Sequence, residues 1–480
     1  MKNSTTTDRL LLLIRDGSPV SLKQQLQLTV LLSIPSIVMQ LSSIVMQYID
    51  AAMVGSLGAG ASASIGLVST TTWLFSGLCG AAATGFSVQV AHRIGAGDFD
   101  NARRLLRQAM GAVLLFSLGL MAVGTGISGH LPHWLGGDES ICAQSSTYFF
   151  IYAMGLPVFQ LNYLAGSMLR CSGNMRVPSM LGVLMCVLDV VFNFFLIFPS
   201  REAGLGSIGL FIPGAGLGVA GAALGTVLAE VASATLMVCY LWRHSPMLNQ
   251  QEMRGRFLPT SANLRNAVKI GLPMGIEHAM ICGAQIMTTV IVAPLGIFAM
   301  AANSFAVTAE SLCYMPGYGI ADAATTLVGQ GLGAGRRRLT RRFAYITVVM
   351  GMVVMGIMGG VMYVGAPFIM SSLTPVDEIR SLGSMALRIE AFAEPMFAAA
   401  IVSYGVFVGA ASTLVPCFMN LFSIWAVRLS LAAVLAPTMG LKGVWLAMCI
   451  ELCFRGLIFL IRLKRGKWMR IPQGTAEKLG

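Results

Sequence analysis

Three polar residues in apolar surroundings are the first candidates for ion chemistry: Asp50, Asp189 and Asn193. Asp50 ends a stripe in which polar residues recur every three or four positions among Ile, Val, Met and Leu. Asp189 and Asn193 are four apart in CVLDVVFNFFLIF, so on a helix they share one face. A carboxylate beside a carboxamide offers several oxygens to a hard cation, or one protonatable site with a neutral partner. We therefore predict that these three residues bind H⁺, or Na⁺ as the only metal, with a purely structural Asp–Asn pair as the alternative.

A second set of polar residues is predicted to line a cavity or to contact substrate. The stripe that ends at Asp50 cannot face lipid tails, so it lines a cavity or a helix contact, and its carboxylate favours the cavity. A shift of 238 residues carries this stripe onto one in which the carboxylate has become Thr288. The candidates are Gln40 and Gln47 on the first stripe, His278, Gln285 and the adjacent Glu277 on the second, and Glu390 and Glu394, which lie one turn apart before Pro395.

Other buried ionisable groups have weaker claims to function. Glu451 and Arg455 are four apart and opposite in sign, so we interpret them as a neutralising pair. No role is assigned to Glu230, Glu310, Asp322 or Arg428. The 10 cysteines lie almost entirely in apolar segments and are expected to be small buried side chains.

The segments that position these residues are membrane helices. The chain of 480 residues is 56% hydrophobic and only 11% charged, and its mean hydropathy is +0.75. Apolar runs of about 18 or more residues recur throughout, which indicates an all-α polytopic membrane protein. We predict twelve transmembrane helices, at 27–50, 64–87, 106–128, 146–170, 176–198, 216–242, 265–292, 300–329, 343–370, 381–409, 413–436 and 441–462.

The chain is an internal duplication. Residues 35–97 align without a gap on residues 273–335, with 14 identities among 63 pairs that include Pro35/Pro273 and two Gly-Ala-Gly triplets. Each half has six predicted spans, an even number, so the two repeats should be parallel. The first half is longer by 16 residues late in its course, which we place in the connection 199–216.

The distribution of positive charge predicts the orientation. Of the 32 Lys and Arg residues, 26 lie at the termini and in the even-numbered connections, and only Arg201, Arg380 and Lys442 lie in the odd-numbered ones. By the positive-inside rule both termini are cytoplasmic, so the net charge of +12 is a topology signal and not a nucleic-acid groove. The predicted parts are a cytoplasmic segment 1–26, a first half 27–242, a linker 243–264, a second half 265–462 and a basic tail 463–480. No phosphate-binding GxxxxGK[ST] motif occurs, which argues against ATP as the energy source.

Several motifs together resemble the multidrug and toxic compound extrusion (MATE) transporters. They are IDAAMVGSLGAGA, VAHRIGAG with its echo VGQGLGAG, GSMLRCSGNMRVP, GLGVAGAALGT and GLKGVWLAM. The resemblance implies two six-helix lobes around a central cleft and export of mostly cationic drugs in exchange for Na⁺ or H⁺. Asp50 matches the family's acidic residue of the first helix. The family's fifth helix has Asn-x-x-x-Asp or Asn-x-x-x-Asn before IFG, whereas here Asp189 and Asn193 stand in exchanged order before IFP, which leaves the choice of ion open.

The function that we expect is therefore secondary antiport by a multi-pass protein of the plasma (inner) membrane. We expect small organic cations and membrane lipid as partners, no cofactor beyond the coupling ion, no nucleic acid, no ATP and a monomeric state. A flippase for lipid-linked oligosaccharides, from the same superfamily, is the alternative, although it should have a strongly basic cleft where we predict an acidic one. An intramembrane enzyme is a distant alternative, because the chain has neither HExxH nor GxSxG.

Overall fold

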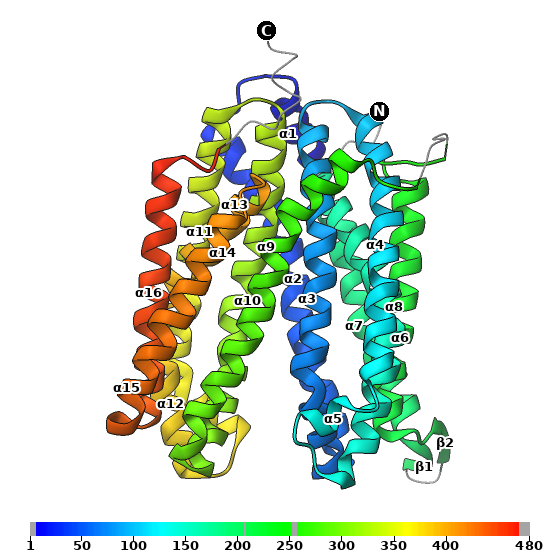
Figure 1. Cartoon of the computed structure of the whole chain (residues 1–480), viewed down its shortest axis with the longest axis vertical. Coiled ribbons are helices and arrows are strands. Elements are labelled where there is room, and N and C mark those ends of the chain that lie inside the picture. The colour runs from blue at the N-terminus through cyan, green and yellow to red at the C-terminus, as the bar shows by residue number, and fades with distance from the viewer. Residues whose placement is uncertain (1–5, 206–207, 252–256, 470–480) are drawn as a thin grey trace.

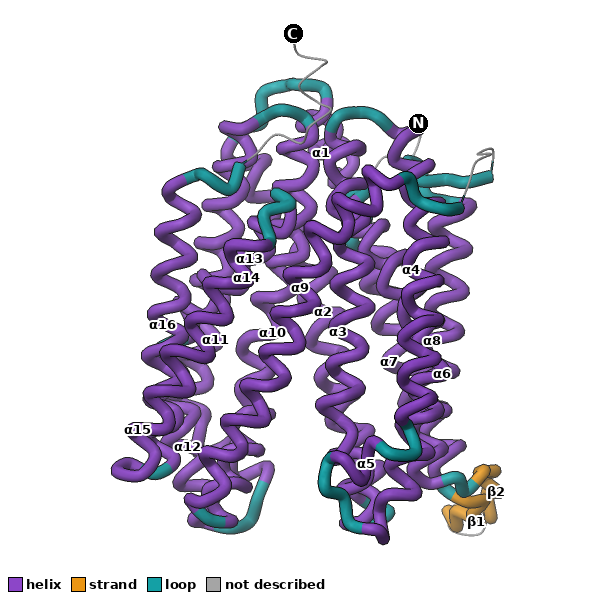
Figure 2. Tube along the Cα trace, viewed as in Figure 1, coloured by secondary structure: helices purple, strands orange, loops and turns teal. Residues whose placement is uncertain are grey.

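The described part of the chain is a bundle of long helices with one small β-hairpin (Figure 1, Figure 2). The computed structural model describes residues 6–205, 208–251 and 257–469, with side chains outside 201–212. The elements of the first half are α1 (Thr6–Arg15), α2 (Leu22–Gly55), α3 (Ala59–Gly95), α4 (Phe99–Ile127), α5 (Leu131–Trp134), α6 (Glu139–Cys171), α7 (Arg176–Ile197), β1 (Pro199–Leu205), β2 (Ile208–Ala215) and α8 (Gly218–Arg243). Those of the second half are α9 (Ser261–Val292), η1 (Ala293–Leu295), α10 (Ile297–Gly333), α11 (Arg337–Leu373), α12 (Asp377–Ala391), α13 (Glu394–Gly409), α14 (Leu414–Leu421), η2 (Phe422–Arg428), α15 (Leu429–Met439) and α16 (Leu441–Arg465).

Every predicted span corresponds to one helix or to one interrupted helix. Within the described residues, ten helices are long and apolar enough to cross a membrane, and the bent pair α12–α13 makes an eleventh. The remaining span corresponds to α10, which is 37 residues long but less apolar than the others. The prediction of a polytopic helical membrane protein is confirmed, while the count of twelve crossings stays a prediction that α10 fits by its length.

The interrupted spans have local causes in the sequence. α12 and α13 meet at an angle of 59°, immediately before Pro395. Proline has no N–H to continue the helical ladder, but it fits the first turn of a new helix, which is its place in α13. The eleventh span contains a π-helical segment, η2, between α14 and α15. Both irregularities lie in the second half, so the duplicated halves differ in detail.

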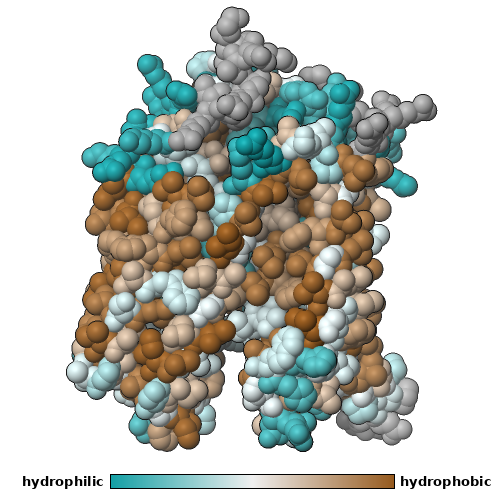
Figure 3. Space-filling model, in the orientation of Figure 1, coloured by the Kyte–Doolittle hydropathy of each residue, from teal (hydrophilic) through white to brown (hydrophobic). Residues whose placement is uncertain are grey.

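The two halves meet along four central helices. α2 packs against α10, α3 packs against α9 and α10, and the end of α6 contacts α10, while α4, α7 and α8 pack mainly against elements of the first half. α1 and the C-terminal end of α16 lie at one end of the bundle, which we call the terminal face, and the other end is the far face (Figure 1). At the far face the halves diverge, and the surface is deeply hollowed between them (Figure 3).

Reciprocal contacts close the terminal face. Gln330 Nε2 of α10 donates to the carbonyl oxygen of Cys171 at 2.7 Å, and His92 Nε2 of α3 lies 2.8 Å from the carbonyl oxygen of Gly409. His92 and Gln330 differ by 238 positions, as do Cys171 and Gly409. The two contacts are thus the same contact made once by each half, which agrees with the duplication.

Glycines in the two repeated Gly-Ala-Gly motifs allow this close approach. A Cβ at Gly95 would collide with the carbonyl oxygen of Gln330, and a Cβ at Gly333 would collide with that of His92. Gly95 and Gly333 are again 238 positions apart, so the glycines of the repeated motif are explained by the close packing of the two halves.

The N-terminal segment forms a short amphipathic helix, which the sequence analysis did not predict. α1 buries Leu10, Leu11 and Ile14 against α2, α10 and α11. Arg15 donates to Gln330 Oε1 at 3.1 Å, and burial lowers the pKa of this guanidinium to about 10, so it stays charged at neutral pH. α1 therefore adds to the closure of the terminal face.

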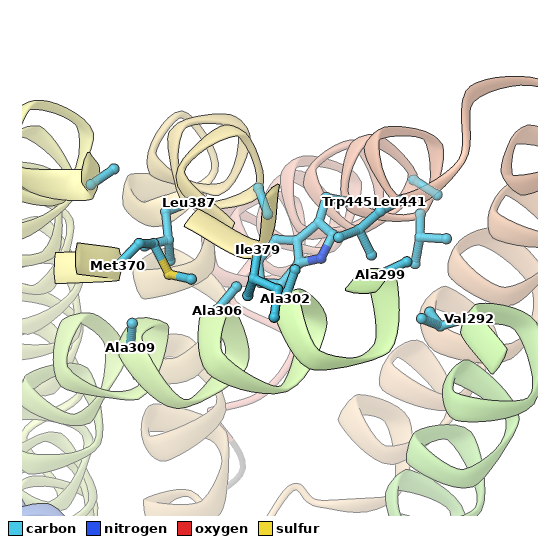
Figure 4. Packing of buried hydrophobic residues seen from close by; sticks show 14 of the residues in the cluster. Val292, Ala299, Ala302, Ala306, Ala309, Met370, Ile379, Leu387, Leu441 and Trp445 are labelled. Atoms are coloured by element: carbon cyan, nitrogen blue, oxygen red, sulfur yellow. The ribbon is translucent and has the colours of Figure 1, made fainter. Parts of the chain in front are cut away.

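Small residues on one face of α10 let its neighbours pack closely. Ala299, Ala302, Ala306 and Ala309 follow helical spacing and contact Trp445 of α16 and side chains of α11 and α12 (Figure 4). Trp445 is 1% exposed, and its Nε1 donates to Asn303 Oδ1 at 3.0 Å, so its one polar atom is satisfied.

The 16 extra residues of the first half form the hairpin at the far face. β1 and β2 pair antiparallel, from Pro199 opposite Ala215 to Leu205 opposite Ile208 (Figure 2). The predicted place of the insertion, 199–216, is confirmed. On the visible face of the molecule a broad apolar belt lies between polar ends, as expected for helices that cross a bilayer (Figure 3).

Candidate functional site

The structure brings Asp50, Asp189 and Asn193 together inside the first half. Asn193 Nδ2 of α7 donates to Asp50 Oδ1 of α2 at 2.9 Å and to Asp189 Oδ2 at 3.1 Å. One amide nitrogen thus joins two carboxyl groups that are far apart in the sequence. We call these three residues the aspartate cluster.

The two residues of the aspartate cluster on α7 are buried, Asp50 is half-buried, and the hydrogen bonds of the cluster are incompletely satisfied. Asp189 and Asn193 are 0% and 1% exposed, and Asp189 Oδ1 and Asn193 Oδ1 have no hydrogen-bond partner among the described residues. α8 passes so close that a Cβ at Gly225 would collide with Asn193 Oδ1. Buried polar oxygens are nearly always paired, so these two mark a place that a cation or a proton could satisfy.

A separate cavity of about 360 Å³ lies between the two halves. It is lined by residues of α2, α3 and α6 from the first half and of α9, α10, α13, α14 and α16 from the second. No residue of the aspartate cluster lines it. The structure therefore separates the candidate ion site from the cavity that both halves share.

Glu277 is one of two acids that line this central cavity. Tyr404 Oη donates to Glu277 Oε2 at 2.6 Å, and Asn420 Nδ2 donates to Glu277 Oε1 at 2.5 Å. Tyr404 and Asn420 also line the cavity. The two donors fix the carboxylate, and each oxygen keeps further capacity to accept.

The cavity lining is mixed in charge, whereas an acidic cleft was predicted. Besides Glu277 it contains Asp322, and it also contains Arg170 and Arg455. Arg170 Nε lies 4.0 Å from Asp322 Oδ2, so these two largely neutralise each other. The prediction of an acidic cleft was wrong because it considered the carboxylates of the helices and not the arginines that line the same cavity.

Arg455 belongs to a buried ion cluster behind the wall of the cavity. Its Nε lies 2.8 Å from Glu451 Oε1, which confirms the predicted Glu451–Arg455 pair. Arg428 Nη2 lies 2.9 Å from Glu451 Oε2, and Ser423 Oγ donates to Glu451 as well. Glu451 is fully buried and forms ion pairs with two arginine side chains, which makes it a structural residue.

The other predicted cavity residues divide into two groups. Gln40 and His278 line the central cavity, and His278 Nε2 lies 3.1 Å from the carbonyl oxygen of Trp73. Gln47 and Gln285 are exposed and do not line it. Each of the two polar stripes therefore reaches the cavity only at its N-terminal end, at Gln40 and at His278.

Glu390 and Glu394 do not line the cavity either. Both are 0% exposed, and none of their carboxyl oxygens has a hydrogen-bond partner among the described residues. They flank the break between α12 and α13, where Glu394 opens a new helix. A carboxylate in the first turn of a helix is favoured by the helix dipole, which offsets part of the cost of burial.

Comparison with known proteins decides the family. A sequence model of the MatE family matches residues 35–195 and again residues 273–434, which begin 238 positions apart. The chain belongs to the MatE family. It is a membrane transporter and not an enzyme.

Curated MatE relatives match over almost their whole length. The chain is 25% identical over 439 residues to a probable multidrug resistance protein NorM of Thermotoga maritima, which covers 90% of each chain. It is 24% identical over 464 residues to a protein of the same name from Xanthomonas campestris pv. campestris, which covers 94% of this chain and 96% of that one.

Solved structures show the same fold. A MATE transporter in complex with MaL6 superposes with a TM-score of 0.85 at 18% identity, over 95% of this chain and 99% of that one. A MOP superfamily transporter of Pyrococcus furiosus superposes with a TM-score of 0.85 at 19% identity, over 97% and 100%.

Sequence reasoning missed three residues that shape the MatE site. Tyr404 and Asn420 hold Glu277, and Arg170 adds positive charge to the wall. Asn420 could have been found, because it is the one carboxamide in a mostly apolar predicted span, 413–436. Tyr404 gave no signal, because a tyrosine in a membrane helix is ordinary.

Proposed function

We propose that this MatE protein is a secondary antiporter of the plasma (inner) membrane, with both termini in the cytoplasm. It exports organic, mainly cationic, drugs or toxic compounds in exchange for Na⁺ or H⁺. The observation that carries the proposal is the pair of separate sites, the aspartate cluster in one half and a cavity with Glu277 between the halves.

The aspartate cluster is suited to hold the coupling cation. Two carboxyl groups that share one amide nitrogen repel each other when both are ionised, and a bound Na⁺ or a proton removes this repulsion. Loss of the cation restores the repulsion between α2 and α7. Because α2 also packs on α10 of the other half, binding or release of the cation can shift the equilibrium between the relative orientations of the two halves.

The central cavity is suited to hold an organic cation. Glu277 supplies a fixed carboxylate, and Tyr318, Phe397 and Tyr404 supply aromatic faces that attract cations. If the terminal face is cytoplasmic as proposed, the hollow at the far face and the closure at the terminal face support an outward-facing state in the cycle. Each charge that moves down a potential of 100 mV supplies about 2.3 kcal/mol for export.

The test uses purified protein in liposomes loaded with ethidium, with Na⁺ and pH gradients imposed separately. We expect one gradient to drive efflux in the wild type, and Asp50→Asn to abolish it while the protein stays folded in the membrane. Thr288→Val, the equivalent position of the second half, is the matched control and should transport normally. Ion-driven efflux that persists in Asp50→Asn would disprove the role of the cluster.

A flippase for lipid-linked oligosaccharides is the second candidate, and the two arginines of the cavity favour it. Arg170 and Arg455 could bind a pyrophosphate, although each is paired with a carboxylate. Absence of efflux under both gradients, together with translocation of a fluorescent lipid-linked pyrophosphate in the same liposomes, would favour the flippase over the antiporter.

A further inference from the structure

A second cavity lies away from the transport site, between the start of α14 and the end of α16. Its volume is about 310 Å³. Val415 and Met419 of α14 and Ile458 and Ile461 of α16 form its apolar wall. Both helix ends lie at the terminal face, so the cavity is at the level where the bundle leaves the membrane.

The remaining lining is entirely basic. Arg462, Arg465 and Lys467 line the cavity, and no acidic residue does. Arg462 Nη2 donates to Ser412 Oγ at 2.9 Å, and its guanidinium carbon lies 5.2 Å from the centre of the Phe407 ring, so its position is fixed. In the part of the chain that the structure describes, neither Arg465 nor Lys467 forms an ion pair.

The surface that continues from this cavity toward the far face is apolar and exposed. Val415 and Ile461 are 44% and 43% exposed, and Phe418, Phe422 and Leu457 beyond them are more than half exposed. Side chains of this kind on a membrane helix face lipid tails. The cavity thus joins a cluster of cations to a surface for acyl chains.

We propose that this cavity binds one anionic phospholipid, with its phosphate against Arg462, Arg465 and Lys467 and its acyl chains along α14 and α16. The charge of the lining selects an anion, and the apolar wall selects a lipid over a free phosphate. The site would hold the eleventh and twelfth spans together where η2 interrupts the former. It lies outside the central cavity and does not depend on which substrate the protein exports.

The experiment measures lipid binding to the full-length protein by native mass spectrometry, after exchange into detergent with defined phosphatidylglycerol or phosphatidylcholine. We expect one tightly bound phosphatidylglycerol in the wild type and about 30-fold weaker binding in Arg465→Gln/Lys467→Gln, from roughly five- to sixfold per removed cation. Arg337→Gln/Arg338→Gln removes two exposed cations from the same face outside the cavity and is the matched control.

Three outcomes would overturn the proposal. Equal binding of phosphatidylcholine would show that charge does not select the lipid. An equal loss in the Arg337/Arg338 control would show a general effect of surface charge. Displacement of the bound lipid by inorganic phosphate at millimolar concentration would show a free-anion site. If the Arg465/Lys467 variant fails to fold, Lys467→Gln alone, beyond the end of α16, gives the same test with a smaller expected loss.

Discussion

The equivalent helices α2 and α9 use acidic residues in opposite ways. On α2, Asp50 points away from the central cavity and reaches α7, where Asn193 joins it to Asp189. On α9, position 288, which is equivalent to Asp50, is a threonine whose hydroxyl donates to its own helix. The acid of α9 is Glu277, which lies on the central cavity and is held by Tyr404 and Asn420.

The difference shows how a duplicated scaffold can divide two tasks. The contacts that close the terminal face are conserved between the halves to the residue position, as His92 and Gln330 show. Carboxylates cost free energy in a membrane and remain only where they bind something or are neutralised. On these two equivalent helices, the first half therefore places its acid inside itself, whereas the second half places its acid where both halves meet. The predictions below test this division.

The largest effect, on the yield of folded protein, is expected at Glu451. This acid belongs neither to the aspartate cluster nor to the lining of the central cavity. Glu451→Gln leaves the partly buried Arg428 and Arg455 without a counter-charge, and removal of one partner from a buried ion cluster costs about 3–5 kcal/mol. We expect little folded protein, measured as monodisperse protein after extraction. Asp189→Asn is the contrasting variant and should extract normally, because it removes a negative charge that no cation neutralises. Equal losses in both variants would contradict the distinction between structural and functional acids.

The next effect is loss of ion coupling without loss of fold. Asp189→Asn should reduce gradient-driven efflux to the level of ethidium-loaded liposomes without protein. The reason is that only one of the two carboxyl groups bonded to Asn193 remains. The combined variant Asp189→Asn/Asn193→Asp keeps the composition and moves the charge by one turn. We expect it to recover part of the transport with altered ion affinity, measured as ion-induced thermal stabilisation.

The outcome of this swap also bears on the exchanged order of acid and amide. No recovery in the double variant would mean that the charge must lie on the Asp189 turn. Full recovery with unchanged ion affinity would mean that only composition matters. The first result would strengthen the picture of the aspartate cluster as a site with a defined place for each group, and the second would contradict it.

The aspartate cluster could be predicted from the sequence because its signals are local. A carboxylate in an apolar run and a second polar group four residues away are visible without a structure, and the cost of burial gives them meaning. That α2 and α7 bring them together depends on packing across more than a hundred residues. The three residues were predicted from the sequence, whereas the contact between Asp50 and the amide of Asn193, which also bonds Asp189, is known only from the fold.

The central cavity was harder to predict because its character depends on which faces meet. Gln40, Glu277 and His278 line it as predicted, but Gln47, Gln285, Glu390 and Glu394 do not. Helical spacing gives the relative direction of side chains on one helix, but it does not say how far along the helix a cavity extends. α1 was missed because ten residues are too few to give a clear amphipathic period.

A smaller effect is expected at Glu277. Glu277→Gln can keep both neighbours bonded, because the new amide oxygen accepts from Asn420 and the amide nitrogen donates to Tyr404 Oη. We expect the KM for ethidium to rise about tenfold, equivalent to about 1.4 kcal/mol, while ion-induced stabilisation stays as in the wild type. A neutral substrate should show no change, and an equal rise in its KM would mean that the variant distorts the cavity.

The smallest effect is expected for the contacts that close the terminal face, where the two halves are alike. His92→Ala and Gln330→Ala each remove one of the two equivalent contacts at the terminal face, at a cost of about 0.5–1.5 kcal/mol. Hydrogen–deuterium exchange at 92–97 and at 330–335 should rise in both variants, because each contact clamps the two halves and not one helix. The increase should be somewhat larger in Gln330→Ala, because this variant also removes the hydrogen bond from Arg15. A rise confined to the segment that carries the substitution would show that the two contacts are independent, and the division of tasks would then extend to the closure as well.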